Sequence, residues 1–413
     1  MAKPLWSMHE PQNPQHVRSP ITGQRARARA ADGAWWEQLP EDFDRRMIDT
    51  GLDAARRLQV QGVSALEWAA RMPLASAVAM ALASSLADPR KVAREFEALR
   101  FYEPLARAGD ASRVFIAPPK DIAIEEEPRP TKDWEGTPIR RSRLRFASPF
   151  VPLNPAAAPG FARMRRSAIS HAEHWCHGDR PRPTLIVIHG FGADPPWLNA
   201  QALSLQALYA AGHDILFFTF PHHGPRAESV LPFNGYGVFG NGLLHFNEVT
   251  LLAIHDLRVY IKHLRRRGVE RIGVAGISLG GYTAALLASV DERVDYCVPV
   301  VPAVSPIDAF LDWQPTGLLL SSMMRSQGVG IAEMRGLVAV HNPLSYASPM
   351  AGERVLIVGG AGDRVTEPHH VDLLHRHWPG STMHWFAGNH LLHFGRREYL
   401  GRMHAHIERW SGV

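Results

Sequence analysis

Residues 271–290 read RIGVAGISLGGYTAALLASV, and this stretch decides the fold. The first seven residues are short and apolar, which is typical of a buried strand, and the Ala- and Leu-rich run after residue 278 favours a helix. Between them, GISLG (276–280) places Ser278 on a tight strand-to-helix turn. Side chains at 276 and 280 would collide around a strained serine, so Gly276 and Gly280 are required, and Gly281 lets the helix pack close to the strand.

The setting of Ser278 indicates a catalytic nucleophile. The turn raises its hydroxyl above the sheet at the positive end of a helix. A serine hydroxyl is a poor nucleophile until a base takes its proton, so the chain must also supply a histidine and an acid that orients it. On a strand–turn–helix of this kind the acid and the histidine follow the serine along the chain.

The acid and the histidine are expected in loops after later strands. Asp363 follows the apolar run RVLIVG (354–359) and is the predicted acid, with Asp308 as the second candidate. His390 comes directly after a Gly-Asn turn in the loop behind TMHWF (382–386) and is the predicted base, with His393 as the competitor.

An acyl-transfer site also needs N–H donors for the oxyanion. The residue after the nucleophile supplies one of them, which here is the backbone N–H of Leu279. The other is expected from HGFG (189–192), directly behind the apolar run TLIVI (184–188), where the glycines free the backbone to aim the N–H of Phe191 at the site.

Strand and helix signals alternate after residue 140. Strands are expected at 184–189, 215–220, 271–277, 294–301, 354–359 and 382–386, and helices at 247–267, 279–290 and 396–410. This order predicts an α/β fold with a mostly parallel sheet and helices on both faces. Residues 303–352 carry no strand pattern and are predicted to form a small helical cap over the carboxyl edge of the sheet.

The chain divides into three predicted parts. Residues 1–32 are polar, Arg-rich and interrupted by proline, and are expected to form a flexible tail. Residues 33–135 are predicted to be a helical extension followed by a proline-rich linker or surface loop at 117–138. Within the extension, the uncharged run 72–87 is too short to span a bilayer and favours a buried helix. Residues 136–413 form the predicted catalytic domain.

Cysteine and histidine usage argues against a metal site. The chain of 413 residues has only Cys176 and Cys297, which rules out a disulfide scaffold and a thiolate zinc cluster. The histidines at 369, 370, 375 and 377 lack the i, i+4 spacing that would put two ligands on one helical face. No metal and no organic cofactor is therefore predicted.

The net charge of +5 comes from arginine, because the chain has only five lysines. Short arginine clusters occur at 25–29, 140–145, 163–166 and 265–267. We interpret them as a solvated face, with peripheral contact to an anionic membrane surface as the alternative. No nucleic-acid-binding motif accompanies them, so nucleic acid is not an expected partner. The first 30 residues have no apolar run typical of a signal peptide, which favours a cytoplasmic location.

Four motifs together resemble the α/β-hydrolase superfamily. HGFG, GISLGG, GAGDRV (360–365) and GNH (388–390) occur in the order typical of that superfamily, with 85 residues from Ser278 to Asp363 and 27 more to His390. The resemblance covers about residues 140–413. FPHHGPR (220–226) together with GISLGGY is most similar to the abhydrolase-domain-containing protein 18 branch. His222 and His223 in that segment are expected either to line the mouth of the pocket or to form a structural turn.

The resemblance and the residues together predict a serine hydrolase that cleaves a carboxylic ester through a Ser-His-Asp triad. The cap and the loop 234–242 are expected to shape a lipophilic pocket, which favours a small-molecule or lipid-like acyl ester as substrate. Two alternatives remain open. The same serine would serve an acyltransferase, and a non-catalytic binding protein could have kept the fold.

Overall fold

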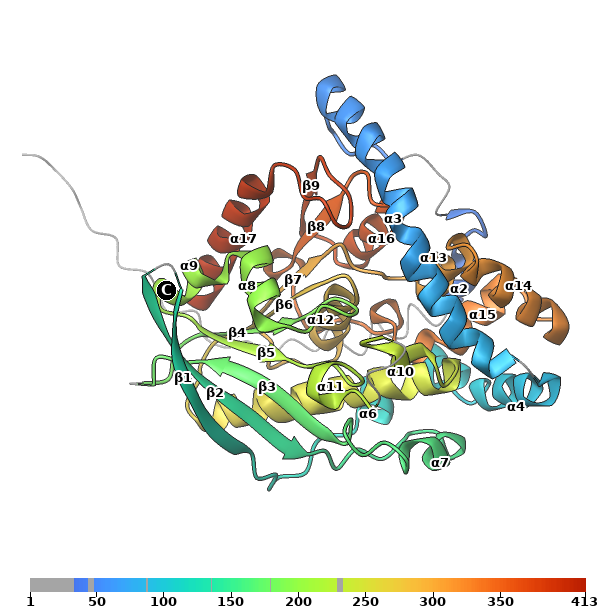
Figure 1. The fold of residues 1–413 in the computed structure, drawn as a ribbon, viewed down its shortest axis with the longest axis horizontal. Helices are drawn as coiled ribbons and strands as arrows, with labels where there is room; N and C mark the ends of the chain where they lie inside the picture. Colours follow the sequence, from blue (N-terminus) through green and yellow to red (C-terminus); the bar gives the residue numbers. More distant parts are fainter. Residues whose placement is uncertain (1–32, 44–47, 87, 135, 179, 229–232) are drawn as a thin grey trace, which may run out of the picture.

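The molecule is built on one sheet of nine strands (Figure 1). The computed structural model describes residues 33–43, 48–86, 88–134, 136–178, 180–228 and 233–413, so the predicted tail at 1–32 lies outside the described residues. The strands are β1 (Glu125–Trp134), β2 (Thr137–Ala147), β3 (Ile169–Trp175), β4 (Thr184–Ile188), β5 (Asp214–Phe218), β6 (Ile272–Ile277), β7 (Tyr296–Val300), β8 (Leu356–Gly360) and β9 (Thr382–Phe386).

The strand order is β1-β2-β3-β5-β4-β6-β7-β8-β9. The six strands from β5 to β9 in this order run parallel, whereas β1, β2 and β3 pair antiparallel at one side. All five residues of β4 and all five of β5 are buried, as expected for parallel strands covered on both faces. The predicted α/β class with a mostly parallel sheet is therefore confirmed.

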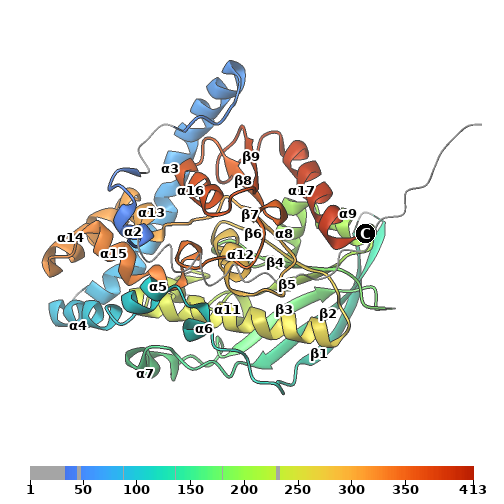
Figure 2. The ribbon, with the colours of Figure 1, turned by 180° about the vertical axis from the view of Figure 1, so that it is seen from behind.

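Helices cover both faces of the sheet (Figures 1 and 2). On β4, Ile186 and Ile188 pack into the core shared with α11 and α12, whereas Leu185 and Val187 pack with α8, α9 and α17. The helices between the strands and at the C-terminus are α7 (Ala158–Phe161), α8 (Pro196–Leu203), α9 (Leu205–Ala210), α10 (Tyr236–Phe239), α11 (Leu243–Arg266), α12 (Leu279–Val290), α16 (Pro368–His377) and α17 (Arg396–Ser411).

Two helical groups lie beside the carboxyl edge of the parallel strands. The segment 303–352 forms α13 (Pro306–Asp312), α14 (Thr316–Gln327) and α15 (Ile331–Leu337), in agreement with the helical insertion expected there. The N-terminal part forms α2 (Trp35–Gln38), α3 (Ala54–Leu86), α4 (Pro89–Leu99), α5 (Glu103–Ala108) and α6 (Ala111–Val114). The long helix α3 runs across α13 and α14 (Figure 1), and Thr316 Oγ1 donates a 2.7 Å hydrogen bond to the carbonyl of Ala75.

The prediction of a linker or loop at 117–138 is wrong for most of this segment, because residues 125–134 form the edge strand β1. Its prolines suggested a loop, but an edge strand tolerates proline because one side of it makes no ladder bonds. The acidic run helps to hold the strand. Glu125 stands opposite Arg145 and Glu127 opposite Arg143, and both pairs are ion pairs, at 2.6 and 3.7 Å.

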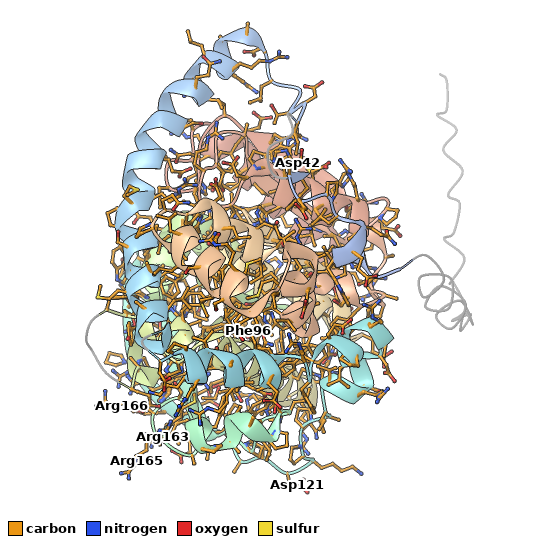
Figure 3. All side chains as sticks on the ribbon, turned by 90° about the vertical axis from the view of Figure 1, so that its right-hand side faces the viewer. Asp42, Phe96, Asp121, Arg163, Arg165 and Arg166 are labelled. Atoms are coloured by element: carbon orange, nitrogen blue, oxygen red, sulfur yellow. The ribbon has the colours of Figure 1, made fainter. Side chains whose placement is uncertain are left out.

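Ion pairs with acidic residues occupy most members of two of the arginine clusters. Arg141 pairs with Glu173 in the 140–145 cluster, and Arg265, Arg266 and Arg267 pair with Asp295, Asp121 and Glu126. Arg163, Arg165 and Arg166 are exposed together at one corner of the surface (Figure 3), and the cluster at 25–29 lies outside the described residues. Within the described ranges, no helix combines the length and apolar character needed to cross a bilayer.

Candidate active site

The backbone of Ser278 is strained, with φ 58° and ψ −116° between β6 and α12. Its neighbours leave no room for side chains. A Cβ on Gly276 would come within 2.3 Å of the backbone of Gly280, and a Cβ on Gly280 within 2.0 Å of the carbonyl oxygen of Ile188 in β4. Gly281 lies against β7, where a Cβ would meet the Val300 oxygen at 2.8 Å. The glycines thus press the start of α12 against two strands and hold Ser278 at its N-terminus.

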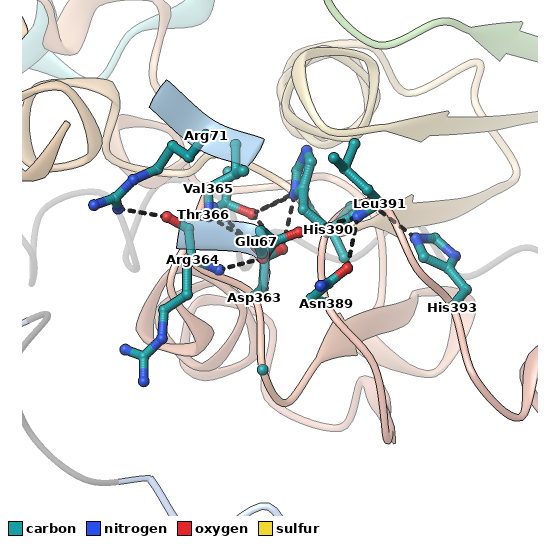
Figure 4. A network of polar contacts seen from close by, with 12 residues as sticks. Glu67, Arg71, Asp363, Arg364, Val365, Thr366, Asn389, His390, Leu391 and His393 are labelled. Carbon is teal, nitrogen blue, oxygen red and sulfur yellow. Dashed lines mark hydrogen bonds and ion pairs between the residues drawn. The ribbon is translucent and has the colours of Figure 1, made fainter. Parts of the chain in front are cut away.

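Asp363 and His390 form a pair at the ends of β8 and β9 (Figure 4). His390 Nδ1 lies 2.8 Å from Asp363 Oδ2, and the other carboxylate oxygen accepts the backbone N–H groups of Val365 at 2.9 Å and Thr366 at 2.7 Å. The Thr366 hydroxyl donates to Asp363 Oδ2 at 2.9 Å. Only 1% of the Asp363 side chain and 8% of the His390 side chain are exposed. The carboxylate is therefore fixed in orientation and directs the free Nε2 of the imidazole away from itself.

The environment of His390 favours its protonated form. Burial by itself lowers the pKa of an imidazole, but the charge of Asp363, the hydrogen bond to it and the charge of Glu67 outweigh burial and raise the pKa of His390 above 6.5. An imidazole of this kind is a stronger base than a free one.

The two alternative candidates, His393 for the base and Asp308 for the acid, have other partners. His393 Nδ1 bonds to the Tyr399 hydroxyl at 2.8 Å and its Nε2 donates to the His390 carbonyl at 3.1 Å, and burial lowers the pKa of His393 to about 4. Asp308 forms a buried ion pair with Arg335, at 2.6 Å. His393 thus supports the backbone of His390, and Asp308 joins two parts of the cap.

Ser278 opens onto a small apolar cavity of about 60 Å³. Thr366 also lines this cavity, so Ser278 and the loop that carries Asp363 meet at one place. Among the described residues, no hydrogen bond joins the Ser278 hydroxyl to the His390 ring, and catalytic hydrogen bonds often tighten only when substrate is bound. The remaining lining residues are Leu74, Val78, Phe191, Phe239, Phe246, Leu279, Tyr282, Ala303, Pro306, Ala309, Phe310, Trp313 and Val365.

Both predicted oxyanion donors border this cavity. Leu279 is the first residue of α12, where a backbone N–H has no partner within the helix. The loop that carries Phe191 is fixed by His189, whose Nδ1 donates to the Gly190 carbonyl at 2.7 Å and whose Nε2 accepts the N–H of Phe220 at 3.0 Å. The role of His189 was not predicted, although its place between an apolar strand and two glycines is a signal that could have found it.

His222 and His223 are not among the residues that line the Ser278 cavity. His222 Nε2 lies 2.8 Å from His245 Nε2, and both rings border a separate cavity of about 700 Å³. His223 is fully buried and packs edge-on against the Phe191 ring, with 5.5 Å between the ring centres. Of the two interpretations of this segment, the geometry fits the structural turn, with His223 packed against the loop of Phe191.

One group of possible metal ligands lies away from this site. In the part of the chain that the structure describes, ligand atoms of Glu126, His174 and Cys176 lie within 4.8 Å of one another. Glu126 already accepts hydrogen bonds from Ser142 at 3.0 Å and Arg267 at 2.6 Å. An arginine charge at the same carboxylate disfavours a second cation.

Helix α3 brings residues to the site that the sequence analysis missed. Ser64, Glu67 and Arg71 contact the loops that carry Asp363 and His390. Their spacing puts them on one face of the helix, so a polar stripe on that face could have been predicted from the sequence. Nothing in the spacing says which loop such a stripe meets, because the loops lie about 300 residues further along the chain.

Comparisons with known proteins find two esterases of similar fold and an uncharacterised relative in sequence. No family model matches the chain. Acetyl xylan esterase 1 from Thermoanaerobacterium sp. JW/SL YS485 is 17% identical with a TM-score of 0.53, over 76% of this chain and 94% of that one. An acetyl xylan esterase from Paenibacillus sp. R4 is 15% identical with a TM-score of 0.53, over 75% and 94%. An uncharacterised protein of Mycobacterium tuberculosis strain H37Rv is 29% identical over 324 residues, 76% of this chain and 74% of its own length.

With its mostly parallel sheet, its helices on both faces and these structural relatives, the chain has the α/β-hydrolase fold. At 15–17% identity the likeness shows the fold alone, so the activity has to be argued from the residues of the site.

Proposed function

We propose that the protein is a serine hydrolase that cleaves carboxylic esters with Ser278, His390 and Asp363. The observation that carries this proposal is the 2.8 Å contact between His390 Nδ1 and Asp363 Oδ2, next to a cavity that the strained Ser278 lines. A buried carboxylate, an imidazole of raised pKa and a serine at a helix N-terminus are the three components that activation of a hydroxyl requires.

In the first half of the reaction, Ser278 Oγ attacks the ester carbonyl while His390 Nε2 takes its proton. Asp363 keeps the imidazole in the tautomer that carries a proton on Nδ1 and stabilises the imidazolium that forms. The N–H groups of Phe191 and Leu279 hold the oxyanion, each contributing about 3 kcal/mol of transition-state stabilisation. The alcohol leaves with the proton from His390, and the acyl group remains on Ser278.

In the second half, His390 takes a proton from water as the water attacks the acyl-enzyme. The same two N–H groups hold the second oxyanion. Collapse of this intermediate releases the carboxylic acid, and the proton on His390 returns to Ser278 Oγ. The cycle ends with the protonation states with which it began, so the residues of this chain suffice for it.

The cavity favours a short acyl group. Its volume of about 60 Å³ is well below the roughly 150 Å³ of an apolar cavity that holds benzene, and its walls are mostly aromatic and aliphatic. Such a space admits an acyl chain from acetyl to butyryl. The range of substrates is therefore narrower than the small-molecule or lipid-like acyl esters expected from the sequence. The two structural relatives are named for an acetyl ester, which agrees with this range.

The narrower resemblance to the abhydrolase-domain-containing protein 18 branch stays part of this proposal. It is supported by FPHHGPR (220–226) and GISLGGY (276–282).

Two measurements test the proposed function. A fluorophosphonate probe should label the purified protein at Ser278, and a folded protein that the probe fails to label would contradict the triad. In a series of p-nitrophenyl esters, kcat/KM for acetate and butyrate should exceed that for octanoate by about tenfold or more. Equal rates along the series would contradict the short acyl pocket. Product analysis with an added alcohol separates a hydrolase from an acyltransferase.

A further inference from the structure

The N-terminal helix α3 reaches the two loops that carry Asp363 and His390 (Figure 4). Three side chains on one face of the helix make the contacts. Ser64 Oγ donates to the Gly362 carbonyl at 2.9 Å, the Glu67 carboxylate accepts from both loops, and Arg71 Nη1 donates to the Arg364 carbonyl at 2.5 Å. Arg71 also pairs with Asp312 of the cap at 2.5 Å, which ties the helix to α13.

Glu67 joins the acid loop to the histidine loop. Its Oε2 accepts the backbone N–H of Arg364 at 2.6 Å, and its Oε1 accepts the backbone N–H of Leu391 at 3.1 Å. These are the residues that directly follow Asp363 and His390. Glu67 is 1% exposed, so few water molecules can replace it as the acceptor. One carboxylate therefore bridges the two loops, beside the direct backbone hydrogen bond from the Gly362 N–H to the Gly388 carbonyl at 2.8 Å.

We propose that Glu67 is a positioning residue of the active site, which holds Asp363 and His390 in register and adds a second negative charge behind the imidazole. The inference rests on the proposed function and extends it to a helix outside the predicted catalytic domain. The same helix supplies Leu74 and Val78 to the wall of the Ser278 cavity. Helix α3 is then part of the site on two sides, and the N-terminal extension has a catalytic purpose.

The charges around Glu67 couple it to His390. Burial and the nearby charge of Asp363 raise the pKa of Glu67 to about 7, whereas a charged His390 and the two N–H donors lower it. The Glu67 charge in turn raises the pKa of His390. The other charged groups at these loops are Arg71, which pairs with Asp312, and Arg364, which pairs with Glu367. An imidazolium that forms in the transition state thus gains from an ionised Glu67.

The experiment compares three variants by the rate of fluorophosphonate labelling of Ser278 as a function of pH. Glu67→Gln removes the charge and turns an amide N–H₂ toward one of the two N–H donors. We expect its labelling rate to fall about tenfold and the midpoint of its acid limb to move down by about half a pH unit, because a charge that favoured the imidazolium is gone. Glu67→Asp keeps the charge but withdraws it by one methylene, so its rate should fall while its midpoint stays.

Ser64→Ala is the matched control, because it removes a hydrogen bond from the same helix face to the same loop without changing a charge. Its melting temperature should fall as that of Glu67→Gln does, while its midpoint remains that of the wild type. A Glu67→Gln variant whose labelling rate has the wild-type pH midpoint would overturn the inference. If Glu67→Gln does not fold, a Glu67→Asp variant labelled at the full wild-type rate would overturn it instead. A wild-type protein that is not labelled overturns the proposed function itself, which separates the two failures.

Discussion

Ser278 and the two residues proposed to assist it, Asp363 and His390, are held in place by different means. Ser278 is fixed by its immediate neighbours along the chain, which press the first turn of α12 against β4 and β7. Asp363 and His390 stand on loops behind β8 and β9, and these loops are joined through side chains, of which Glu67 comes from a helix 297 residues before its partner Arg364.

The position of Ser278 and the positions of Asp363 and His390 therefore depend on different interactions. The turn at Ser278 is a matter of backbone sterics, so changing the hydroxyl should leave its shape unchanged. The loops of Asp363 and His390 are joined by buried charge and by hydrogen bonds between distant segments, so we expect their geometry to respond to pH and to the packing of α3. Perturbations of the two regions should therefore differ in size and in kind.

The largest effect is expected for Ser278→Ala. It removes the nucleophile without altering the glycines that shape the turn, so kcat should fall about 10⁴-fold or more while the melting temperature stays near that of the wild type. Ester hydrolysis and thermal denaturation measure the two quantities. A variant with near wild-type turnover would move the reaction to another residue.

The second-largest effect is expected from a comparison of substitutions at two buried aspartates. Asp363→Asn keeps the shape of the side chain but favours the wrong imidazole tautomer, so kcat should fall about 10³- to 10⁴-fold.

Asp308→Asn is the matched substitution away from His390. It leaves the fully buried Arg335 without its charge partner and should lower the free energy of unfolding by about 3 kcal/mol or more, while the folded fraction keeps its kcat. Denaturant unfolding and kinetics measure both variants. If Asp308→Asn proved the less active of the two, the acid would have to be reassigned.

The smallest effect is the pH dependence of the wild type. The pKa of His390 is raised above 6.5, and only the neutral imidazole can take the Ser278 proton. Activity should therefore be full above the raised pKa and be lost as the pH falls through it, with a midpoint above 6.5. The profile of kcat/KM for a short ester between about pH 5 and 9 measures it. A midpoint below 6.5 would mean that Asp363 and Glu67 do not act on His390 as their positions suggest.

Much of the central sheet could be predicted from the sequence. The apolar runs at 184–188 and 382–386 are the strands β4 and β9, and the glycine pattern around Ser278 placed the start of α12 correctly. These features depend on neighbours within about ten residues, where strand burial and glycine sterics can be read directly.

The antiparallel side of the sheet could not be predicted in the same way. β1 contains two prolines and an acidic run, and its residues form a strand by pairing with β2, where Arg143 and Arg145 stand opposite the acids. The register of the pair decides which charges meet, and the sequence of β1 alone holds no record of that register.

The sequence by itself determined the strained turn at Ser278 and the order of the serine, the acid and the histidine along the chain. Only the tertiary structure decided that α3 lies against the loops of Asp363 and His390, that His222 faces a different cavity, and that the cavity at Ser278 is small. Steric limits on a turn act between neighbours in the chain, whereas a buried carboxylate and a cavity wall are defined by segments that only the packing of the whole molecule brings together.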